Sequence, residues 1–167
     1  HDDIVINVQG DEPVVPPPVI EFVSELLQKY PDLDCANPVE HITDKSELDN
    51  PHRIKAVLSN NERLIYLTRQ SIPCSTFDID KEATFFRQTC VMAFRGDFLQ
   101  MFCKTPQSNL ELVEGIDMLR LIQNGYPIAC STIDDATYPV DVTEDIKVIE
   151  TVLQNDKWIA EYNDFSG

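Results

Sequence analysis

Two adjacent carboxylates, Asp11 and Glu12, follow a short apolar segment at residues 4–8. Gly10 permits a tight bend before them, and Pro13 prevents the extended segment from continuing. Ligands of open α/β sheets bind outside the carboxyl ends of the strands, where carboxylate oxygens suit Mg²⁺, a cation that also binds phosphate. A solvated acidic turn after a strand explains the same residues equally well. The segment alone therefore leaves both interpretations open.

Three further side chains have types that suit a binding site. Asp141 follows a second strand-like stretch, although its place just before Thr143 is more typical of a carboxylate at the N-terminus of a helix. Arg69 directly follows the strand-like residues 64–68. Its guanidinium could bind a carboxylate in bidentate fashion, or the side chain could simply lie on the surface at the end of the strand. Lys55 could contact phosphate or sugar, but a lysine at the edge of a sheet is the simpler interpretation.

The composition excludes several classes of partner. The 167 residues include 13 Lys and Arg against 29 Asp and Glu, a formal net charge of -16. This argues against nucleic acids and anionic membranes as partners, and no apolar run approaches the roughly 20 residues of a membrane span. A small anionic substrate stays compatible, because local cations and a metal can override the overall field. The five irregularly spaced cysteines form no CxxC pair, which favours reduced core residues in a cytoplasmic protein over a zinc site.

Strands alternate with helices along the chain, which predicts an α/β fold with a mixed sheet. We expect one domain over residues 1–167, with an uncertain tail at 156–167. Because an apolar strand starts within a few residues of His1, we also expect that a preceding part of the protein is missing. The expected strands cover residues 4–8, 35–39, 54–58, 64–68, 89–94 and 128–132, with the third and fourth forming a hairpin. Four helices are expected. The first covers residues 20–30, and a brief second one is capped by residues 44–47. The third runs from the capping box at 108–111 to residue 121, and the last begins at Thr143.

Seven short motifs follow one another along the chain. They are Val5-Ile-Asn-Val-Gln-Gly-Asp-Glu-Pro13, Asn50-Pro51, Lys55-Ala-Val-Leu58, Leu64-Ile-Tyr-Leu-Thr-Arg69-Gln-Ser-Ile-Pro73, Leu110-Glu-Leu-Val-Glu114, Asp117-Met-Leu-Arg120 and Val140-Asp141-Val-Thr-Glu-Asp145. In this order they closely resemble the 3-deoxy-manno-octulosonate cytidylyltransferase family, the CMP-Kdo synthetases. The resemblance runs from about residue 4 to residue 153, and the first motif is fairly specific to the family.

The resemblance implies a Rossmann-like nucleotidyltransferase fold, similar to GT-A, with three layers and a mixed sheet. It implies a Mg²⁺-dependent enzyme of the bacterial cytoplasm that transfers CMP from CTP to Kdo or a related ulosonic acid and releases pyrophosphate, for lipopolysaccharide or capsular polysaccharide synthesis. Family members are commonly homodimers, so we expect a homodimer. The family's nucleotide-binding loop precedes the first motif, so we expect this chain to be the C-terminal two-thirds of the fold and to be inactive alone.

The resemblance also assigns roles to individual residues. Asp11 and Asp141 match the metal-binding aspartates of the family. Arg69 matches an arginine that contacts the sugar acid, and Gln9 matches a glutamine that hydrogen-bonds the sugar. Asp117 stands where the family carries a glutamate that faces the sugar, so the charge is kept but the reach is shorter.

Three positions near the sugar depart from the family pattern. Gln88 stands in place of a histidine, Met92 in place of a tyrosine and Met118 in place of a glutamine. A pocket that loses a polar partner discriminates against a sugar that needs that hydrogen bond. We therefore expect a diverged sugar pocket and a related ulosonic acid as substrate, with Kdo itself still compatible.

Two other functions fit parts of the sequence. A GT-A-like glycosyltransferase also uses a strand-end aspartate and a divalent ion, but such enzymes usually carry a DxD motif where residues 10–12 read Gly-Asp-Glu. Asp78-Ile-Asp80 has the DxD letters, yet it follows Pro73 in a loop segment and is interpreted as coincidental. A catalytically degenerate homologue that binds a sugar acid, or only supports a dimer, is kept open by the changed sugar pocket.

Overall fold

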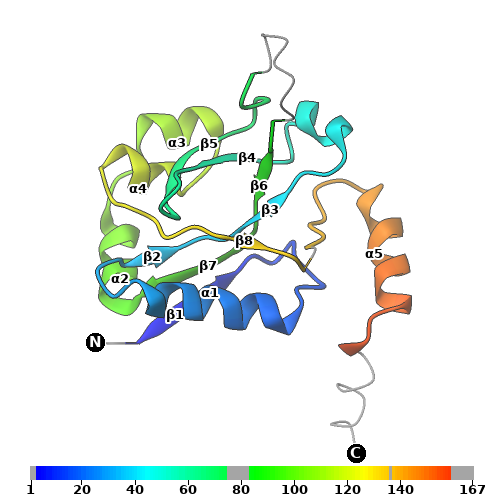
Figure 1. The fold of residues 1–167 in the computed structure, drawn as a ribbon, viewed down its shortest axis with the longest axis horizontal. Helices are drawn as coiled ribbons and strands as arrows, with labels where there is room; N and C mark the ends of the chain where they lie inside the picture. The colour runs from blue at the N-terminus through cyan, green and yellow to red at the C-terminus, as the bar shows by residue number, and fades with distance from the viewer. Residues whose placement is uncertain (1–2, 75–82, 136, 159–167) are drawn as a thin grey trace, which may run out of the picture.

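Two small sheets form the middle layer of the fold (Figure 1). The structure is a computed structural model that describes residues 3–74, 83–135 and 137–158. The strand orders are β1-β7-β2 and β5-β4-β6-β3-β8, and within the described residues the β3–β8 pair alone is parallel. The mixed sheet that the sequence predicted is confirmed. The strands are β1 (Ile4–Val8), β2 (Cys35–Ala36), β3 (Val39–His41), β4 (Lys55–Leu58), β5 (Leu64–Thr68), β6 (Phe86–Gln88), β7 (Val91–Arg95) and β8 (Thr132–Ile133).

Strand β7 lies at the centre of the fold and is buried on both faces. Side chains of a strand alternate between the two faces of a sheet. Val91 and Ala93 therefore face one hydrophobic core, while Met92 and Phe94 face the other. The first core lies under helix α1, and the second lies under the helices of the opposite face.

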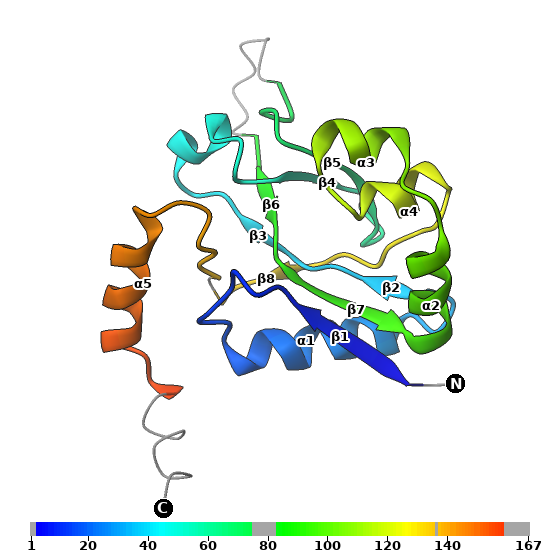
Figure 2. The same cartoon turned by 180° about the vertical axis from the view of Figure 1, so that it is seen from behind.

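Helices cover both faces of the sheets, which confirms the three-layer fold. Helix α1 lies on one face, and α2, α3 and α4 lie on the other (Figures 1 and 2). Helix α5 stands to one side of these layers in both views. None of the helices in the described part of the chain is long and apolar enough to cross a membrane. The helices are α1 (Pro17–Lys29), the 3-10 helix η1 (Lys45–Asp49), α2 (Gly96–Lys104), α3 (Asn109–Glu114), α4 (Leu119–Gln123) and α5 (Asp145–Gln154).

The chain crosses between the two sheets at two adjacent places, at Asn37 between β2 and β3 and at Thr89 between β6 and β7. The fully buried amide of Asn37 joins these crossings. Its Nδ2 donates to the carbonyl oxygens of Thr89 at 3.0 Å and Val91 at 3.2 Å. Its Oδ1 accepts a hydrogen bond from Nε2 of Gln88 at 2.6 Å. The sequence predicted uninterrupted strands at residues 35–39 and 89–94, but each is bent here because the ladder of one sheet ends and that of the other begins.

Other local predictions are confirmed or corrected by the structure. The hairpin of β4 and β5 forms as predicted, and Asp44 caps η1 by accepting a hydrogen bond from the backbone of Ser46. The strand expected at 128–132 is shorter, and β8 begins only at Thr132. Strand β1 is less buried than its apolar sequence suggested, because within the described residues it pairs with β7 alone.

Two predicted helix boundaries are wrong for identifiable reasons. The helix expected from 108 to 121 is broken, because Gly115 adopts a left-handed conformation with φ of 66° and ends α3. Thr143 does not cap the last helix. Instead, Oδ2 of Asp145 accepts hydrogen bonds from the backbone nitrogens of Asp141 at 2.9 Å and Val142 at 3.1 Å.

The Asn37 junction gives a prediction about stability. Replacing Asn37 by Ala leaves the carbonyl groups of Thr89 and Val91 buried with fewer donors, and each lost partner of a buried polar group costs about 1–3 kcal/mol. We expect Asn37→Ala to lower the free energy of unfolding by about 3 kcal/mol in urea titrations. Asn60→Ala, an exposed change in the β4–β5 turn, serves as the control and is expected to cost less than about 0.5 kcal/mol. Equal effects of the two substitutions would contradict the role given to Asn37.

Candidate active site

A cavity of about 230 Å³ opens beside the junction of the two sheets. It collects side chains from six separate segments of the chain, and among them are the six polar residues that the sequence analysis placed at the metal or at the sugar. Their convergence places the candidate metal ligands and the candidate sugar contacts in one site. The six are Gln9, Asp11, Arg69, Gln88, Asp117 and Asp141.

The two candidate metal ligands are brought together by the backbone. After β1 the chain turns, with Glu12 N donating to Gln9 O at 3.1 Å, and this turn carries Asp11. Val140 N donates to Asp11 O at 2.8 Å, which fixes the segment of Asp141 against the end of β1. The described residues hold no cluster of three or more His, Cys, Asp or Glu side chains arranged for a metal. Two carboxylates nevertheless fit Mg²⁺, which commonly takes one or two from the protein and completes its shell with substrate phosphates and water.

Asp141 has a partner that the sequence did not reveal. Nη1 of Arg53 lies 2.8 Å from Oδ2 of Asp141, and Nη2 of Arg53 lies 4.0 Å from Oδ1 of Asp145. Arg53 also lines the cavity. Its Nε atom is buried and has no hydrogen-bond partner among the described residues. Neither helical nor strand periodicity marks Arg53, because it lies in the irregular loop between η1 and β4.

Arg69 lies at the cavity, but its guanidinium is already held by backbone carbonyl groups. Nε donates to Glu114 O at 2.7 Å, Nη1 to Pro51 O at 2.7 Å and Nη2 to Gly115 O at 3.3 Å. The side chain therefore ties the end of β5 to α3 and to the loop before β4. A guanidinium has five N–H groups, so two are left for a ligand.

Lys55 does not lie at an exposed sheet edge, which corrects the simpler interpretation of the sequence. Strand β4 runs between β5 and β6, and Lys55 is fully buried. Its Nζ donates to Asn50 O at 2.8 Å and to Arg53 O at 2.7 Å. Burial lowers the pKa of Lys55, and the positive charge of Arg69 acts in the same direction. Lys55 thus holds the loop that carries Arg53.

The two methionines that were expected in the sugar pocket lie elsewhere. Met92 and Met118 are both fully buried in the hydrophobic core under α2, α3 and α4. Met92 points there because of the alternation along β7. Gln88 and Asp117, in contrast, do line the cavity. Burial raises the pKa of Asp117.

A buried acidic group lies behind the cavity. Glu40 accepts hydrogen bonds from Arg87 Nη2 at 2.7 Å and from Thr137 Oγ1 at 2.5 Å. Glu12 is buried close to Thr137 and Cys90, yet neither of its oxygens has a hydrogen-bond partner of good geometry within the described residues. Burial raises the pKa of Glu12 to about 7, and the negative charges of Glu40 and Asp11 add to this. Burial also raises the pKa of the Cys90 thiol, so it stays protonated and is no candidate nucleophile.

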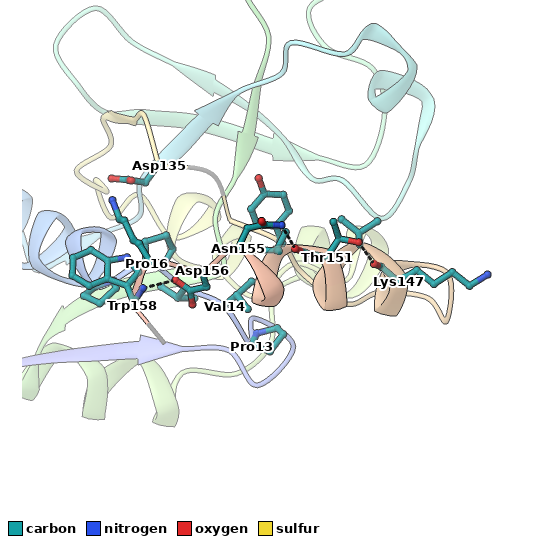
Figure 3. A pocket seen from close by; sticks show the side chains of 15 residues that line it. Pro13, Val14, Pro16, Asp135, Lys147, Thr151, Asn155, Asp156 and Trp158 are labelled. Carbon is teal, nitrogen blue, oxygen red and sulfur yellow. Dashed lines mark hydrogen bonds between the residues drawn. The ribbon is translucent and has the colours of Figure 1, made fainter. Parts of the chain in front are cut away.

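A second cavity is larger but carries none of the candidate metal ligands or sugar contacts. It has a volume of about 860 Å³ and lies between the loop at residues 13–17 and helix α5, with Trp158 lining one end (Figure 3). Its walls are mainly apolar, with Val14, Val15 and Tyr138 among them. The smaller cavity is the better candidate for chemistry, because the carboxylates and guanidinium groups converge there. The DxD letters at Asp78 and Asp80 lie outside the described residues.

A mixed sheet enclosed by helices on both faces, with acidic groups at the end of its first strand, defines a Rossmann-like nucleotidyltransferase domain. A solved structure of CMP:2-keto-3-deoxy-manno-octonic acid synthetase complexed with CTP superposes on it with a TM-score of 0.82 and 28% sequence identity. That match covers 92% of this chain and 63% of the other. The chain belongs to the cytidylyltransferase family, since the family model described as Cytidylyltransferase matches residues 1–133.

Curated relatives agree with this assignment. The chain is 34% identical over 152 residues to 3-deoxy-manno-octulosonate cytidylyltransferase of Chlamydia trachomatis serovar L2, covering 90% of this chain and 59% of that protein. It is 34% identical over 159 residues to the enzyme of the same name from Neisseria meningitidis serogroup C, covering 90% and 62%. The chain thus spans about three-fifths of the length of the curated relatives it matches. The family resemblance noted in the sequence is confirmed.

One wall of the cavity depends on an ion pair between α3 and α4. Gly115, Ile116 and Asp117 line the cavity from the turn between these helices. Behind the turn, Arg120 Nε donates to Glu111 Oε2 at 2.7 Å and Nη2 donates to Oε1 at 2.5 Å. Glu111 is 5% exposed and also completes the capping box of α3. The hydrogen bonds from Arg120 lower the pKa of Glu111 to about 2.

This ion pair predicts a pH dependence of stability. The pKa of Glu111 is lower in the folded chain than its ordinary value of 4.5. Its contribution is therefore complete above about pH 4.5 and is lost as the pH falls toward about 2, and a shift of this size corresponds to about 3 kcal/mol. We expect Glu111→Gln to lower the free energy of unfolding by about 3 kcal/mol at pH 6.5 and by clearly less at pH 3, measured in urea.

An exposed carboxylate on α1 provides the control for this measurement. Glu25→Gln is expected to change the free energy of unfolding by less than about 0.5 kcal/mol at either pH. If Glu111→Gln cost the same at both pH values, the loss would come from packing rather than from the charge of the carboxylate.

Proposed function

We propose that the protein is a cytidylyltransferase that transfers CMP from CTP to a 3-deoxy-2-keto sugar acid and releases pyrophosphate. The observation that supports this most directly is the convergence of Gln9, Asp11, Arg69, Gln88, Asp117 and Asp141 on one cavity. The solved relative with a TM-score of 0.82 is a CMP:2-keto-3-deoxy-manno-octonic acid synthetase complexed with CTP. Because this chain spans only part of its relatives, the activity is proposed for the protein as its gene encodes it.

Within this proposal, Asp11 and Asp141 would hold Mg²⁺. The ion would supply charge neutralisation at the phosphates of CTP when it is bound. The residues themselves contribute oxygen ligands from two segments joined by the Val140–Asp11 hydrogen bond of 2.8 Å. Arg53 is paired with Asp141 in the structure, so the metal and this guanidinium compete for the same carboxylate.

The residues that face the cavity narrow the range of sugar acids proposed as the substrate. Met92 and Met118 lie in the core, so their departure from the family pattern changes packing rather than sugar contacts. Gln88 and Asp117 are the two departures that line the cavity, and both keep a polar group that hydrogen-bonds a hydroxyl. We therefore propose Kdo or an ulosonic acid that differs from it at few positions. This reduces the support for a degenerate homologue, which rested on three altered sugar contacts.

Assembly and location are part of the same proposal. The resemblance to CMP-Kdo synthetases supports a homodimer that works in the bacterial cytoplasm and serves lipopolysaccharide or capsular polysaccharide synthesis. A glycosyltransferase is the less favoured alternative. The metal loop reads Gly-Asp-Glu rather than DxD, and the family model that matches residues 1–133 is that of cytidylyltransferases.

The proposal is tested by pyrophosphate release from CTP and Mg²⁺ with a panel of ulosonic acids, using the protein as its gene encodes it. We expect turnover with Kdo or a close relative, and we expect Asp11→Asn to reduce kcat/KM by about 100-fold or more, because it removes a charged ligand of the metal. Asp32→Asn, which changes an exposed aspartate outside the cavity, should leave the rate within about twofold.

Two outcomes would contradict the proposal. The first is the absence of pyrophosphate release with every acid in the panel, which would favour a sugar-acid binding protein. The second is turnover that is equally fast in Asp11→Asn, which would place the chemistry away from this cavity.

A further inference from the structure

Three guanidinium groups line the cavity, and they differ in how many of their N–H groups are already engaged. Arg87 donates to Glu40 and to Thr137 O. Arg69 donates to three backbone carbonyl groups. Arg53 has a single close partner, the carboxylate of Asp141 at 2.8 Å. Of the three, Arg53 therefore has the greatest remaining capacity to bind a ligand.

The Nε–H group of Arg53 lacks a hydrogen-bond acceptor among the described residues. This nitrogen is buried and has no hydrogen-bond partner within the described part of the chain. Buried polar groups in native structures almost always have a partner, and leaving a charged donor without one is unfavourable. A small turn of the side chain toward an acceptor in the cavity would remove this deficit, whereas an apolar ligand would leave it.

Arg53 is also held in place before any ligand arrives. Lys55 Nζ donates to Arg53 O at 2.7 Å, and Arg69 Nη1 donates to Pro51 O at 2.7 Å. Two buried or half-buried cations thus brace the loop on either side of His52. The side chain of Arg53 is 16% exposed, so little of its charge is screened by solvent. A braced and partly desolvated guanidinium binds an anion with little loss of conformational entropy.

We propose that Arg53 binds the carboxylate of the sugar acid and is a specificity-determining residue of this site. The inference rests on the proposed function. A planar guanidinium matches a carboxylate in bidentate geometry, with two of its N–H groups facing the two oxygens. Asp11, Asp117 and Asp141 line the same cavity and would repel an acidic sugar unless a cation compensated for them.

The carboxylate of the sugar is a better match than a phosphate of the nucleotide. The cavity of about 230 Å³ lies below the range of about 300–1,000 Å³ typical of sites for larger ligands. A volume of this size suits a sugar better than a whole nucleoside triphosphate. Gln9 and Gln88, which line it together with Arg53, are groups that hydrogen-bond hydroxyls. Arg53 thus lies among groups suited to a sugar.

The test compares a sugar acid with its neutral carboxamide in wild type, Arg53→Gln and Arg53→Lys, using the protein as its gene encodes it. Dissociation constants come from titration calorimetry without CTP, and KM values for the acid and for CTP come from pyrophosphate release. We expect Arg53→Gln to weaken binding and raise the KM of the acid by roughly 30-fold or more. Its affinity for the carboxamide and its KM for CTP should change less than about threefold. Arg53→Lys should fall between, with a loss of about 10-fold, since it keeps the charge but not the fork.

The carboxamide separates recognition from a structural role. A variant whose cavity is distorted would bind the acid and the carboxamide equally poorly, and that result would overturn the proposal. An increase in the KM of CTP as large as that of the acid would overturn it in favour of a phosphate contact. Arg63→Gln, which removes an arginine at the hairpin turn outside the cavity, is the matched control and should bind both ligands as wild type does.

The calorimetric arm also keeps this inference distinct from the proposed function. If wild type turned over the acid and Arg53→Gln did so with the same KM, the function would stand and the role of Arg53 would fall. If wild type turned over no acid in the panel, the function would fall. The ratio of acid to carboxamide affinity in the two proteins would then still decide whether Arg53 binds a carboxylate.

Discussion

The candidate site depends on one buried amide at the place where two sheets meet. A backbone that passes from one sheet to the next loses its ladder partners at the bend, and buried carbonyl groups without partners are strongly unfavourable. Asn37 replaces the missing ladder with its own donors to Thr89 O and Val91 O and with an acceptor for Gln88. The bend it stabilises keeps Gln88 and Cys90 at the cavity. The interruption in the sheet and the site beside it are therefore one structural feature.

Features that arise within a few residues were predictable from the sequence. The capping box at Ser108, the β4–β5 hairpin and the acidic turn that carries Asp11 all depend on neighbouring residue types, and all are found. One local feature was missed. Gly115 ends α3 in the left-handed conformation that glycine favours, but the apolar spacing continues across it and predicted an unbroken helix.

The directions of side chains were the least predictable part of the site. Family resemblance placed Met92 and Met118 near the sugar, yet the packing of β7 and the following helices directs both into the core. Lys55 looked like an edge residue until β6 was found beside β4. Arg53 carried no local signal, since its importance comes from Asp141, which is 88 positions away. Each of these misses concerns which partner a residue meets in three dimensions, and residue type alone does not contain that information.

The acidic composition and the cations of the cavity act on different length scales. The net charge of -16 describes the field far from the molecule, where it disfavours anionic polymers. Within the cavity, the guanidinium groups lie in direct contact with individual acidic or carbonyl groups, at hydrogen-bond distance. Among the described residues, the segment from Val140 into α5 contacts the body through the Arg53 ion pairs, the Val140–Asp11 backbone hydrogen bond and the buried side chain of Ile149, while α5 leaves Ile146, Val148 and Leu153 exposed. Salt therefore has little effect on the alignment of the two aspartates. Asp11 lies in the turn directly after β1, and the side chains of the Arg53–Asp141 pair are only 16% and 24% exposed. A partly buried ion pair is screened by salt much less than a surface pair, so the two halves of the site stay aligned over a wide range of buffers.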